Sequence, residues 1–201
     1  MKIKVILLCW LLIVLAGFPG YSQGKNKECK GFFRWDVKTL TDSSDLTFMF
    51  DLPSDSTIEE LIAEPPPVKM GILSKKAGHL PRFDSEKHLV KVIALVTKMS
   101  IQGDQDYHII LRSTESKASM IGEIPDPDCS YLSDFPIQRE KFRVTRKQGD
   151  AIFNILKETN KPVLVEVTGV LFWDAPHFWL KGSSSTGREI HPVLEIKAIG
   201  K

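Results

Sequence analysis

Cysteine is scarce in this sequence, and its three copies lie far apart, at Cys9, Cys29 and Cys129 in a chain of 201 residues. Zinc sites built on cysteine use ligands in closely spaced pairs, and the sequence contains no such pair. The scarcity therefore disfavours a cysteine-ligated metal centre.

Compact catalytic motifs are missing too. The sequence has no G-x-S-x-G nucleophile elbow, no H-E-x-x-H zinc motif, no Walker loop and no dinucleotide-binding glycine pattern. Nucleases and other enzymes that act through carboxylates need no compact signature, so those classes stay open. The absences favour a protein without catalytic activity.

A hydrophobic run long enough to span a bilayer is also lacking. The longest run, Val5–Leu15, is much shorter than the roughly 20 apolar residues that a spanning helix needs. Lys2 and Lys4 precede it and small residues and breakers follow it, which is the pattern of an export signal. We expect residues 1–22 to be a Sec signal peptide, so that a periplasmic or extracellular protein without a membrane span results.

Loss of this signal removes two lysines and leaves 25 basic and 25 acidic residues. Proteins that bind phosphate backbones usually carry a basic surplus, so nucleic acid is not a favoured partner. The mature chain also keeps only Cys29 and Cys129. In an oxidising compartment an even pair predicts one disulfide, which would pin the N-terminal segment to the body of the protein. Two unpaired buried thiols are the alternative.

Residues 23–85 are rich in Asp, Ser and Pro and are predicted to form an irregular extension, a strap over the domain. One short helix is expected at 57–63, with Ser56 as its N-cap and acidic residues in its first turn. The three prolines at 65–67 end it. The globular domain is expected to span residues 86–201.

Within that domain the pattern predicts three strands, a helix and two further strands. The strands, rich in β-branched residues, are expected at 89–99, 107–111, 118–124, 162–173 and 189–199. The helix is expected at 146–159, with Thr145 as its N-cap. This order is that of the five-stranded oligonucleotide/oligosaccharide-binding (OB) barrel, in which Gly169 would allow a bend. An open α+β sandwich gives the same order and remains the alternative.

Several strings of the mature chain carry a resemblance to known proteins. They are M-I-G-E-I-P-D-P-D-C at 120–129, D-Y-H-I-I-L at 106–111, V-T-G-V-L-F-W-D at 167–174, E-I-H-P-V-L-E-I at 189–196 and C-K-G-x-x-R-W-D-V-K-T-L-T-D at 29–42. Together they resemble an uncharacterised family of secreted bacterial proteins over nearly all of the mature chain. The resemblance implies export and an OB-type barrel, but no particular activity. The barrel order is also similar, more distantly, to thermonuclease-type members of the OB class, whose catalytic carboxylates and arginines match poorly.

The OB class also indicates where a ligand would bind. Such barrels bind over their second and third strands, between the loop joining strands 1 and 2 and the loop joining strands 4 and 5. The polar and aromatic residues expected around that rim are Asp104, Asp106, His108, Asp174, His177, Trp179 and His191. We predict them as ligand-binding residues. Carboxylates and imidazoles within reach of one another could hold a divalent metal, either Ca²⁺ or Mg²⁺ on oxygens or Zn²⁺ on imidazole.

Structural roles for the same residues stay open. Asp104 and Asp106 flank a tight turn, where Asp commonly bonds to backbone. His108 and His191 lie in expected strands, where histidines are often hydrogen-bonded structural groups. Trp179 can pack on the barrel end.

Three functions follow from these observations. The leading hypothesis is a secreted, non-catalytic OB-type module that binds a ligand or partner of unknown identity. The first alternative is a metal-dependent phosphodiesterase of thermonuclease type, with Asp104 or Asp106 holding a cation and Arg112 or Arg139 stabilising the phosphoryl charge. The second alternative is a structural envelope protein.

Overall fold

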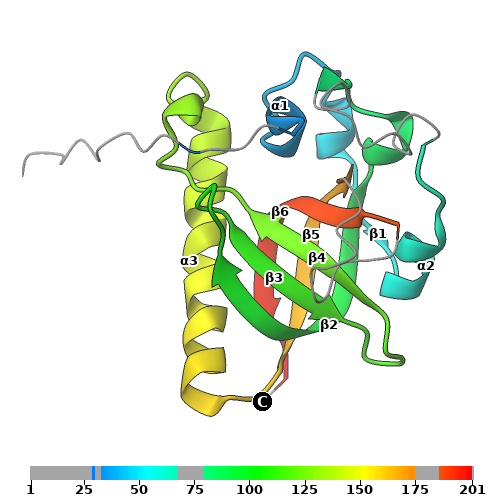
Figure 1. The fold of residues 1–201 in the computed structure, drawn as a ribbon, viewed down its shortest axis with the longest axis vertical. Helices are drawn as coiled ribbons and strands as arrows, with labels where there is room; N and C mark the ends of the chain where they lie inside the picture. The colour runs from blue at the N-terminus through cyan, green and yellow to red at the C-terminus, as the bar shows by residue number, and fades with distance from the viewer. Residues whose placement is uncertain (1–28, 30–32, 68–78, 175–185, 201) are drawn as a thin grey trace, which may run out of the picture.

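The structure is a computed structural model that describes residues 29, 33–67, 79–174 and 186–200 (Figure 1). Its strands are β1 (Ser54–Asp55), β2 (Leu89–Ile101), β3 (Tyr107–Arg112), β4 (Ser119–Ile124), β5 (Val163–Trp173) and β6 (Arg188–Ala198). Its α-helices are α1 (Trp35–Lys38), α2 (Ile58–Ala63) and α3 (Pro136–Thr159). Short 3₁₀ helices lie at Thr47–Phe50, Asp84–Glu86 and Ser130–Leu132.

Five of these strands close into a barrel. The hydrogen-bonded order β2-β3-β4-β6-β5 returns to β2, because β2 pairs with β3 near its end and with β5 along its first part. In an OB barrel the long first strand pairs with two different strands, and a helix lies between the third and fourth barrel strands. Here β2 is that first strand, and α3 lies between β4 and β5. The prediction of a mainly β, five-stranded OB-type barrel with an irregular N-terminal extension is confirmed, and the open sandwich is wrong.

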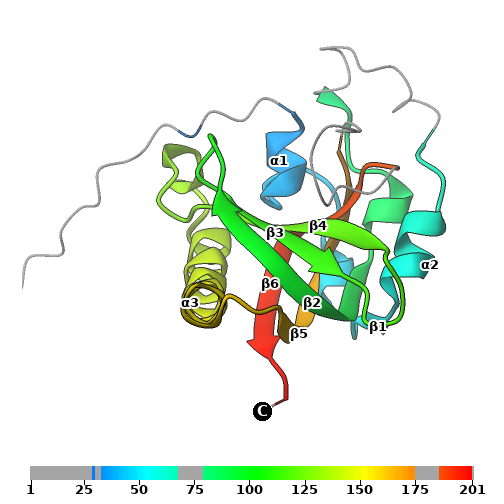
Figure 2. The ribbon, with the colours of Figure 1, turned by 60° about the horizontal axis from the view of Figure 1, so that its bottom comes forward.

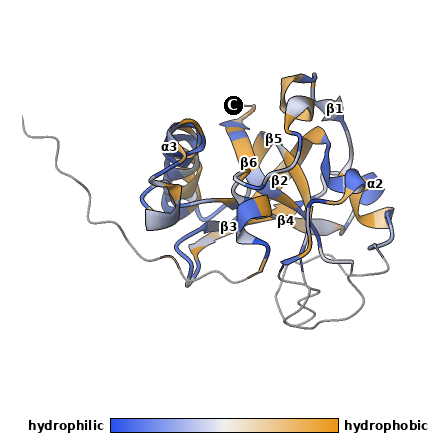
Figure 3. Ribbon diagram, turned by 90° about the horizontal axis from the view of Figure 1, so that it is seen from above, coloured by the Kyte–Doolittle hydropathy of each residue, from blue (hydrophilic) through white to orange (hydrophobic). Residues whose placement is uncertain are grey.

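The barrel encloses the main core, and α3 packs along its side (Figure 2). Hydrophobic residues gather on the strands, whereas α3 is largely hydrophilic on its outside (Figure 3). Ile152 is the fully covered contact of α3 with that core, while Phe153 and Leu156 pack at its edge. The helix therefore presents an apolar stripe at helical spacing, as predicted.

The start of α3 was predicted wrongly. The helix begins at Pro136, ten residues before the expected start, because proline is well suited to the first helical turn. Thr145 is not its N-cap but lies buried inside the helix. Its hydroxyl donates to the carbonyl oxygen of Leu194 at 2.7 Å, which ties α3 to β6.

Gly169 lies where β5 bends against β6. The pairing register shifts on both sides of this residue. A Cβ atom there would lie 2.3 Å from Ile190 Cγ2 and 2.6 Å from the carbonyl oxygen of Pro192, so only glycine permits this approach. The close packing fixes the segment of β6 around His191, whose peptide bond to Pro192 is cis.

The N-terminal extension contributes α1, β1 and α2. Helix α2 is confirmed, but its N-cap is Thr57 and not Ser56. Thr57 forms a capping box with Glu60, in which each side chain bonds the other residue's backbone N–H. A second helix in the extension, α1, was not predicted, and Lys38 is its last residue.

This extension packs on the outside of the barrel, where it builds a second apolar core with β5, β6 and the start of α3. Its buried members are Leu40, Phe48, Leu132, Phe142, Val170 and Leu194. In Figures 1 and 2, α1 lies at one end of the barrel strands, with α2 and α3 on opposite sides. The extension thus covers part of the outer face of the barrel.

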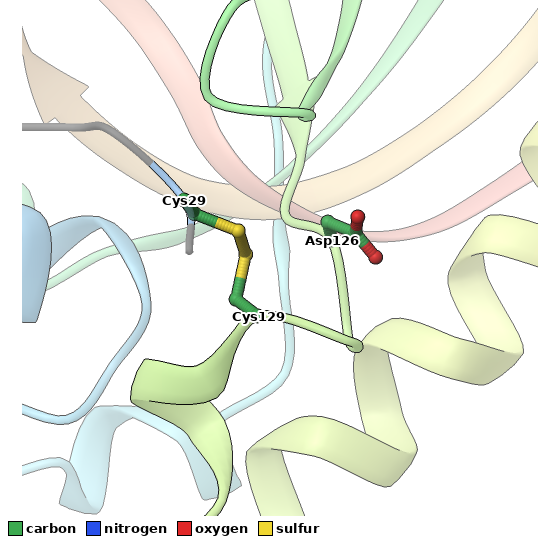
Figure 4. Close-up of side chains that lie close together, drawn as sticks. All are labelled: Cys29, Asp126 and Cys129. Atoms are coloured by element: carbon green, nitrogen blue, oxygen red, sulfur yellow. A yellow bond between two sulfur atoms is a disulfide. The ribbon is translucent and has the colours of Figure 1, made fainter. Parts of the chain in front are cut away.

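A buried ion pair and a disulfide attach the extension. Arg34 Nη1 and Nη2 donate to the two carboxylate oxygens of Glu86 at 2.6 and 2.5 Å, and both side chains are fully buried. Glu86 also accepts the backbone N–H groups of Trp173 and Phe83. Figure 4 shows the disulfide between Cys29 and the segment after β4, where the Cα atoms of the two cysteines are 5.5 Å apart.

Some predictions fall on parts of the chain that are not described. The expected signal at 1–22 and the loop residues His177 and Trp179 lie outside the described residues. None of the described helices combines the length and the hydrophobicity needed to cross a membrane.

Candidate functional site

Charged and polar side chains gather on the outer face of the barrel. Those on the strands occupy positions that alternate with the positions whose side chains fill the main core inside the barrel. We call this group the polar cluster. All its members are buried, and they are Lys38, Asp106, His108, Glu123, Asp174, Glu189 and His191.

Strand register brings the members of the polar cluster together. His108 on β3 is paired directly with Glu123 on β4. The parallel pairing of β4 with β6 matches Ile121 with Glu189, so two residues further along Glu123 comes beside His191. Side chains that are opposite on one face of neighbouring strands lie about 5 Å apart. The residues 108, 123 and 191 therefore form one row across three strands.

His191 lies between two carboxylates. Its Nδ1 atom is 2.9 Å from Glu123 Oε2, and its Nε2 atom is 3.5 Å from Asp106 Oδ2. Asp106 holds a fixed orientation, because its Oδ1 atom accepts the backbone N–H of Asp126 at 3.0 Å. The ring of Phe172 supports the imidazole from the side, with the ring centroids 5.7 Å apart.

Several buried polar atoms of the polar cluster lack a well-directed hydrogen bond. Neither ring nitrogen of His191, nor Asp106 Oδ2, His108 Nε2 or Glu189 Oε2, has a hydrogen-bond partner among the described residues. The 2.9 Å separation at Nδ1 of His191 is close enough for attraction, but the N–H direction does not meet the carboxylate oxygen. Buried groups of this kind are rare in proteins and point to a missing partner.

Burial disturbs the acids of the polar cluster. It raises the pKa of Asp106 to about 6, although the neighbouring His191 acts in the opposite direction. Burial, together with the charges of Asp174 and Glu123, raises the pKa of Glu189 well above its ordinary value. Both carboxyl groups are therefore hard to ionise where they lie.

The bases respond to the same surroundings. Burial by itself lowers the pKa of His191, but Glu123 and Asp106 outweigh it, and the net shift is upward. The pKa of Glu123 moves down, because His191 and Lys38 outweigh burial. Burial lowers the pKa of His108. The upward pKa shift of His191 shows that the neighbouring carboxylates make the electrostatic potential around its imidazole negative.

Lys38 reaches the polar cluster from α1 of the extension. Its Nζ atom is 3.2 Å from Asp174 Oδ2 and 5.1 Å from the centroid of the Phe172 ring. Burial opposes its charge, but Asp174, Glu123 and Glu189 raise its pKa overall. The extension thus supplies a cation to a face that OB barrels use for ligands.

The polar cluster nevertheless holds more negative than positive charge. Among the described residues, its four carboxylates face one ammonium group, that of Lys38, and two imidazoles, those of His108 and His191. When all four carboxylates are ionised and His108 is neutral, two negative charges stay uncompensated even with Lys38 and His191 both charged. Burying an uncompensated charge is costly, so the cluster favours the uptake of positive charge, either as protons on Asp106 and Glu189 or as a bound cation.

The structure brings together four of the residues predicted from the sequence, namely Asp106, His108, Asp174 and His191. Asp104 is half-buried in the turn before β3, and its Oδ1 atom accepts the backbone N–H of Asp106 at 3.2 Å. This contact is the turn role that the sequence left open. Whether these residues bind a ligand stays a prediction.

Three members of the polar cluster were not predicted, namely Lys38, Glu123 and Glu189. A signal existed for Glu123, because it is the one charged residue inside a mostly apolar strand, whereas Glu189 lies in a strand that holds several other polar residues. A buried charge at such a position destabilises the folded state unless another polar group pairs with it. Lys38 carried no comparable signal, since its place depends on how the extension folds back.

The two arginines named for phosphoryl transfer lie elsewhere. Arg112 is exposed at the opposite end of β3 from Asp106. Arg139 lies on α3, where it donates to the carbonyl oxygen of Pro127 and contacts Asp128 at 3.6 Å. No arginine belongs to the polar cluster as the described residues define it, so neither of the two arginines expected to stabilise a phosphoryl group lies there.

A second group of candidate ligands is Cys29, Asp126 and Cys129, shown in Figure 4. The two sulfur atoms are bonded to each other. A disulfide offers no thiolate for a metal, so this group has a structural role.

No protein-family profile matches the chain, and no curated protein sequence matches it. The chemistry of the polar cluster therefore rests on its geometry.

Proposed function

We propose that this chain is an exported, non-catalytic binding module with an OB-type barrel, and that its ligand is a cation held at the polar cluster. The observation that carries the proposal is the charge imbalance. Among the described residues, four buried carboxylates are accompanied by the cationic or ionisable groups of Lys38, His108 and His191. A cationic ligand supplies the missing positive charge.

The covered position of the polar cluster supports a small ligand. An OB barrel that binds a nucleic-acid or sugar chain presents an open face over the corresponding strands. Here Asp106 and His191 on that face are fully buried, and α1 contributes Lys38 from above. A polymer could reach these side chains only after the extension had moved away.

Export and membership in the resembled family of secreted bacterial proteins belong to the same proposal. They are supported by the basic and apolar pattern of residues 1–22 and by the disulfide between Cys29 and Cys129, a bond that persists in oxidising compartments. Mass spectrometry of the exported protein tests this part. A first residue of Gln23 is expected, and an intact N-terminus at Met1 in the exported protein contradicts it.

Cation binding is tested by thermal unfolding of the chain from residue 23 onward. The probes are Zn²⁺, Ca²⁺, Mg²⁺ and spermidine, with a neutral oligosaccharide and single-stranded DNA for comparison. A ligand at about 100 times its Kd stabilises a protein by roughly 2.7 kcal/mol. For a chain of this size that corresponds to a rise in Tm of about 5–10 °C.

A matched pair of variants assigns the effect to the polar cluster. Glu189→Gln replaces a buried carboxyl group that a bound cation would draw into its charged form. Glu195→Gln removes a charge from a more exposed position on the same strand. A cationic probe is expected to raise the Tm of the wild type and of Glu195→Gln, and to raise it less in Glu189→Gln. A rise only with the oligosaccharide or DNA, a rise that Glu189→Gln leaves intact, or no rise at all contradicts the proposal. Turnover of a chromogenic phosphodiester contradicts its non-catalytic part.

A further inference from the structure

Three side chains of the polar cluster meet as metal ligands do. They come from three neighbouring strands: Asp106 directly precedes β3, Glu123 lies on β4 and His191 lies on β6. Each can place one ligand atom so that the three atoms lie within 4.8 Å of one another. Residues this far apart in the sequence are brought together only by closure of the barrel.

The separation between His191 and Asp106 is long for hydrogen bonding but suits coordination, whereas Glu123 Oε2 lies 2.9 Å from the other ring nitrogen, Nδ1. His191 Nε2 and Asp106 Oδ2 are 3.5 Å apart, whereas a good hydrogen bond between nitrogen and oxygen measures about 2.9 Å. Two ligand atoms at a tetrahedral ion with bonds of about 2.1 Å lie about 3.4 Å apart. The observed separation matches the distance across such an ion.

The atoms involved are available. Asp106 Oδ2 and His191 Nε2 are fully buried and form no well-directed hydrogen bond among the described residues, and one ion can bond to only one of the two ring nitrogens of His191. The other oxygen of Asp106 is held by the backbone N–H of Asp126, which fixes the carboxylate and leaves Oδ2 toward the imidazole. Ligands oriented by a second bond of this kind bind metals more tightly.

We propose that Asp106, Glu123 and His191 bind one divalent transition-metal ion, of which Zn²⁺ is the best match. This inference rests on the proposed function, because the ion is the cation that the polar cluster lacks. Two carboxylates and one imidazole form a mixed oxygen and nitrogen set that suits zinc. Calcium takes six to eight oxygen ligands and would find too few here. A histidine that binds a metal is neutral, so the four ionised carboxylates then exceed the charge of Lys38 by three, and the ion offsets two of these negative charges.

Calorimetric titration of Zn²⁺ into the chelator-treated chain from residue 23 onward measures binding directly. The wild type is expected to bind one ion per chain. Asp106→Asn and His191→Gln each remove one ligand and are expected to weaken binding by 100-fold or more. His88→Gln is the control for His191→Gln, because His88 is exposed and lies outside the polar cluster. Glu195→Gln is the control for loss of an acidic residue on β6. Neither control is expected to change the affinity.

Cobalt substitution provides an independent reading of the ligand set. Co²⁺ in a site of low coordination number absorbs visible light, and the wild type is expected to show these bands while Asp106→Asn loses them. If His191→Gln fails to fold, wild-type protein with ¹⁵N-labelled imidazoles answers the same question. Zinc must then shift the ring-nitrogen resonances of one buried histidine and leave those of His88 unchanged.

The outcomes separate this inference from the proposed function. If no metal binds but spermidine raises the Tm, the metal site is wrong and the cation-binding function stands. If no cation of either kind has an effect, both are wrong. If zinc binds with equal affinity to Asp106→Asn and the wild type, or shifts no buried histidine, the proposed ligand set is overturned.

Discussion

Replacing Glu86 by Gln tests how the extension is held on the barrel and is expected to destabilise the protein strongly. Glu86 accepts two bonds from Arg34 and one backbone N–H each from Trp173 and Phe83, and it is fully buried. Gln keeps a single acceptor oxygen and presents an amide donor toward other donors. The buried guanidinium of Arg34 then has no anionic partner at this position.

The size of the effect follows from the burial of both partners. Removing one partner of a buried ion pair typically costs about 3–5 kcal/mol. For a protein of this length, that free energy lowers the Tm by roughly 6–20 °C. The surface charge of Asp84, in the same short 3₁₀ helix, is 97% exposed, so Asp84→Asn serves as the control and is expected to leave the Tm unchanged.

Urea denaturation with the disulfide intact, followed by tryptophan fluorescence, measures both variants. Trp173 is fully buried beside Glu86, so its emission reports the unfolding of this region. Equal unfolding free energies for Glu86→Gln and Asp84→Asn would refute the view that this ion pair holds the extension in place.

Two further perturbations test the frame around the polar cluster. Gly169→Ala is expected to cost about 3 kcal/mol or more, because its Cβ would overlap Ile190 and the backbone of Pro192, whereas a Cβ at Gly103 meets nothing within 4 Å. Urea midpoints check this, and equal midpoints for Gly169→Ala and Gly103→Ala would show that β6 shifts without strain. Reduction of the disulfide releases a loop of about 100 residues and is expected to cost roughly 4 kcal/mol in the chain-entropy model. Melting curves with and without reductant measure it, and superimposable curves would count against the bond.

The barrel could be predicted because its strands carry their own signal. Runs of Val, Ile and Leu marked all five strands to within about two residues, and the order of strands and helix selected the OB arrangement. The first ten residues of α3 escaped, because 136–145 is mostly polar and only Phe142 and Thr145 are buried. A helical segment with so few buried positions shows little periodicity in its hydrophobic residues, which is the signal that predicts a helix.

The polar cluster could be predicted only in part. The OB analogy pointed to Asp106, His108, Asp174 and His191, since the loops and strand ends of such barrels converge on one rim. Glu123 was missed because charge in an apolar strand was not weighed as a buried partner. Lys38 could not be found at all, because its arrival depends on tertiary packing of the extension and not on local pattern.

Anomalous diffraction from crystals grown with zinc, recorded on both sides of the zinc absorption edge, tests the central claim most directly. A single strong peak within bonding distance of Asp106, Glu123 and His191 is predicted. No peak there, or peaks only at exposed histidines such as His88, would contradict it.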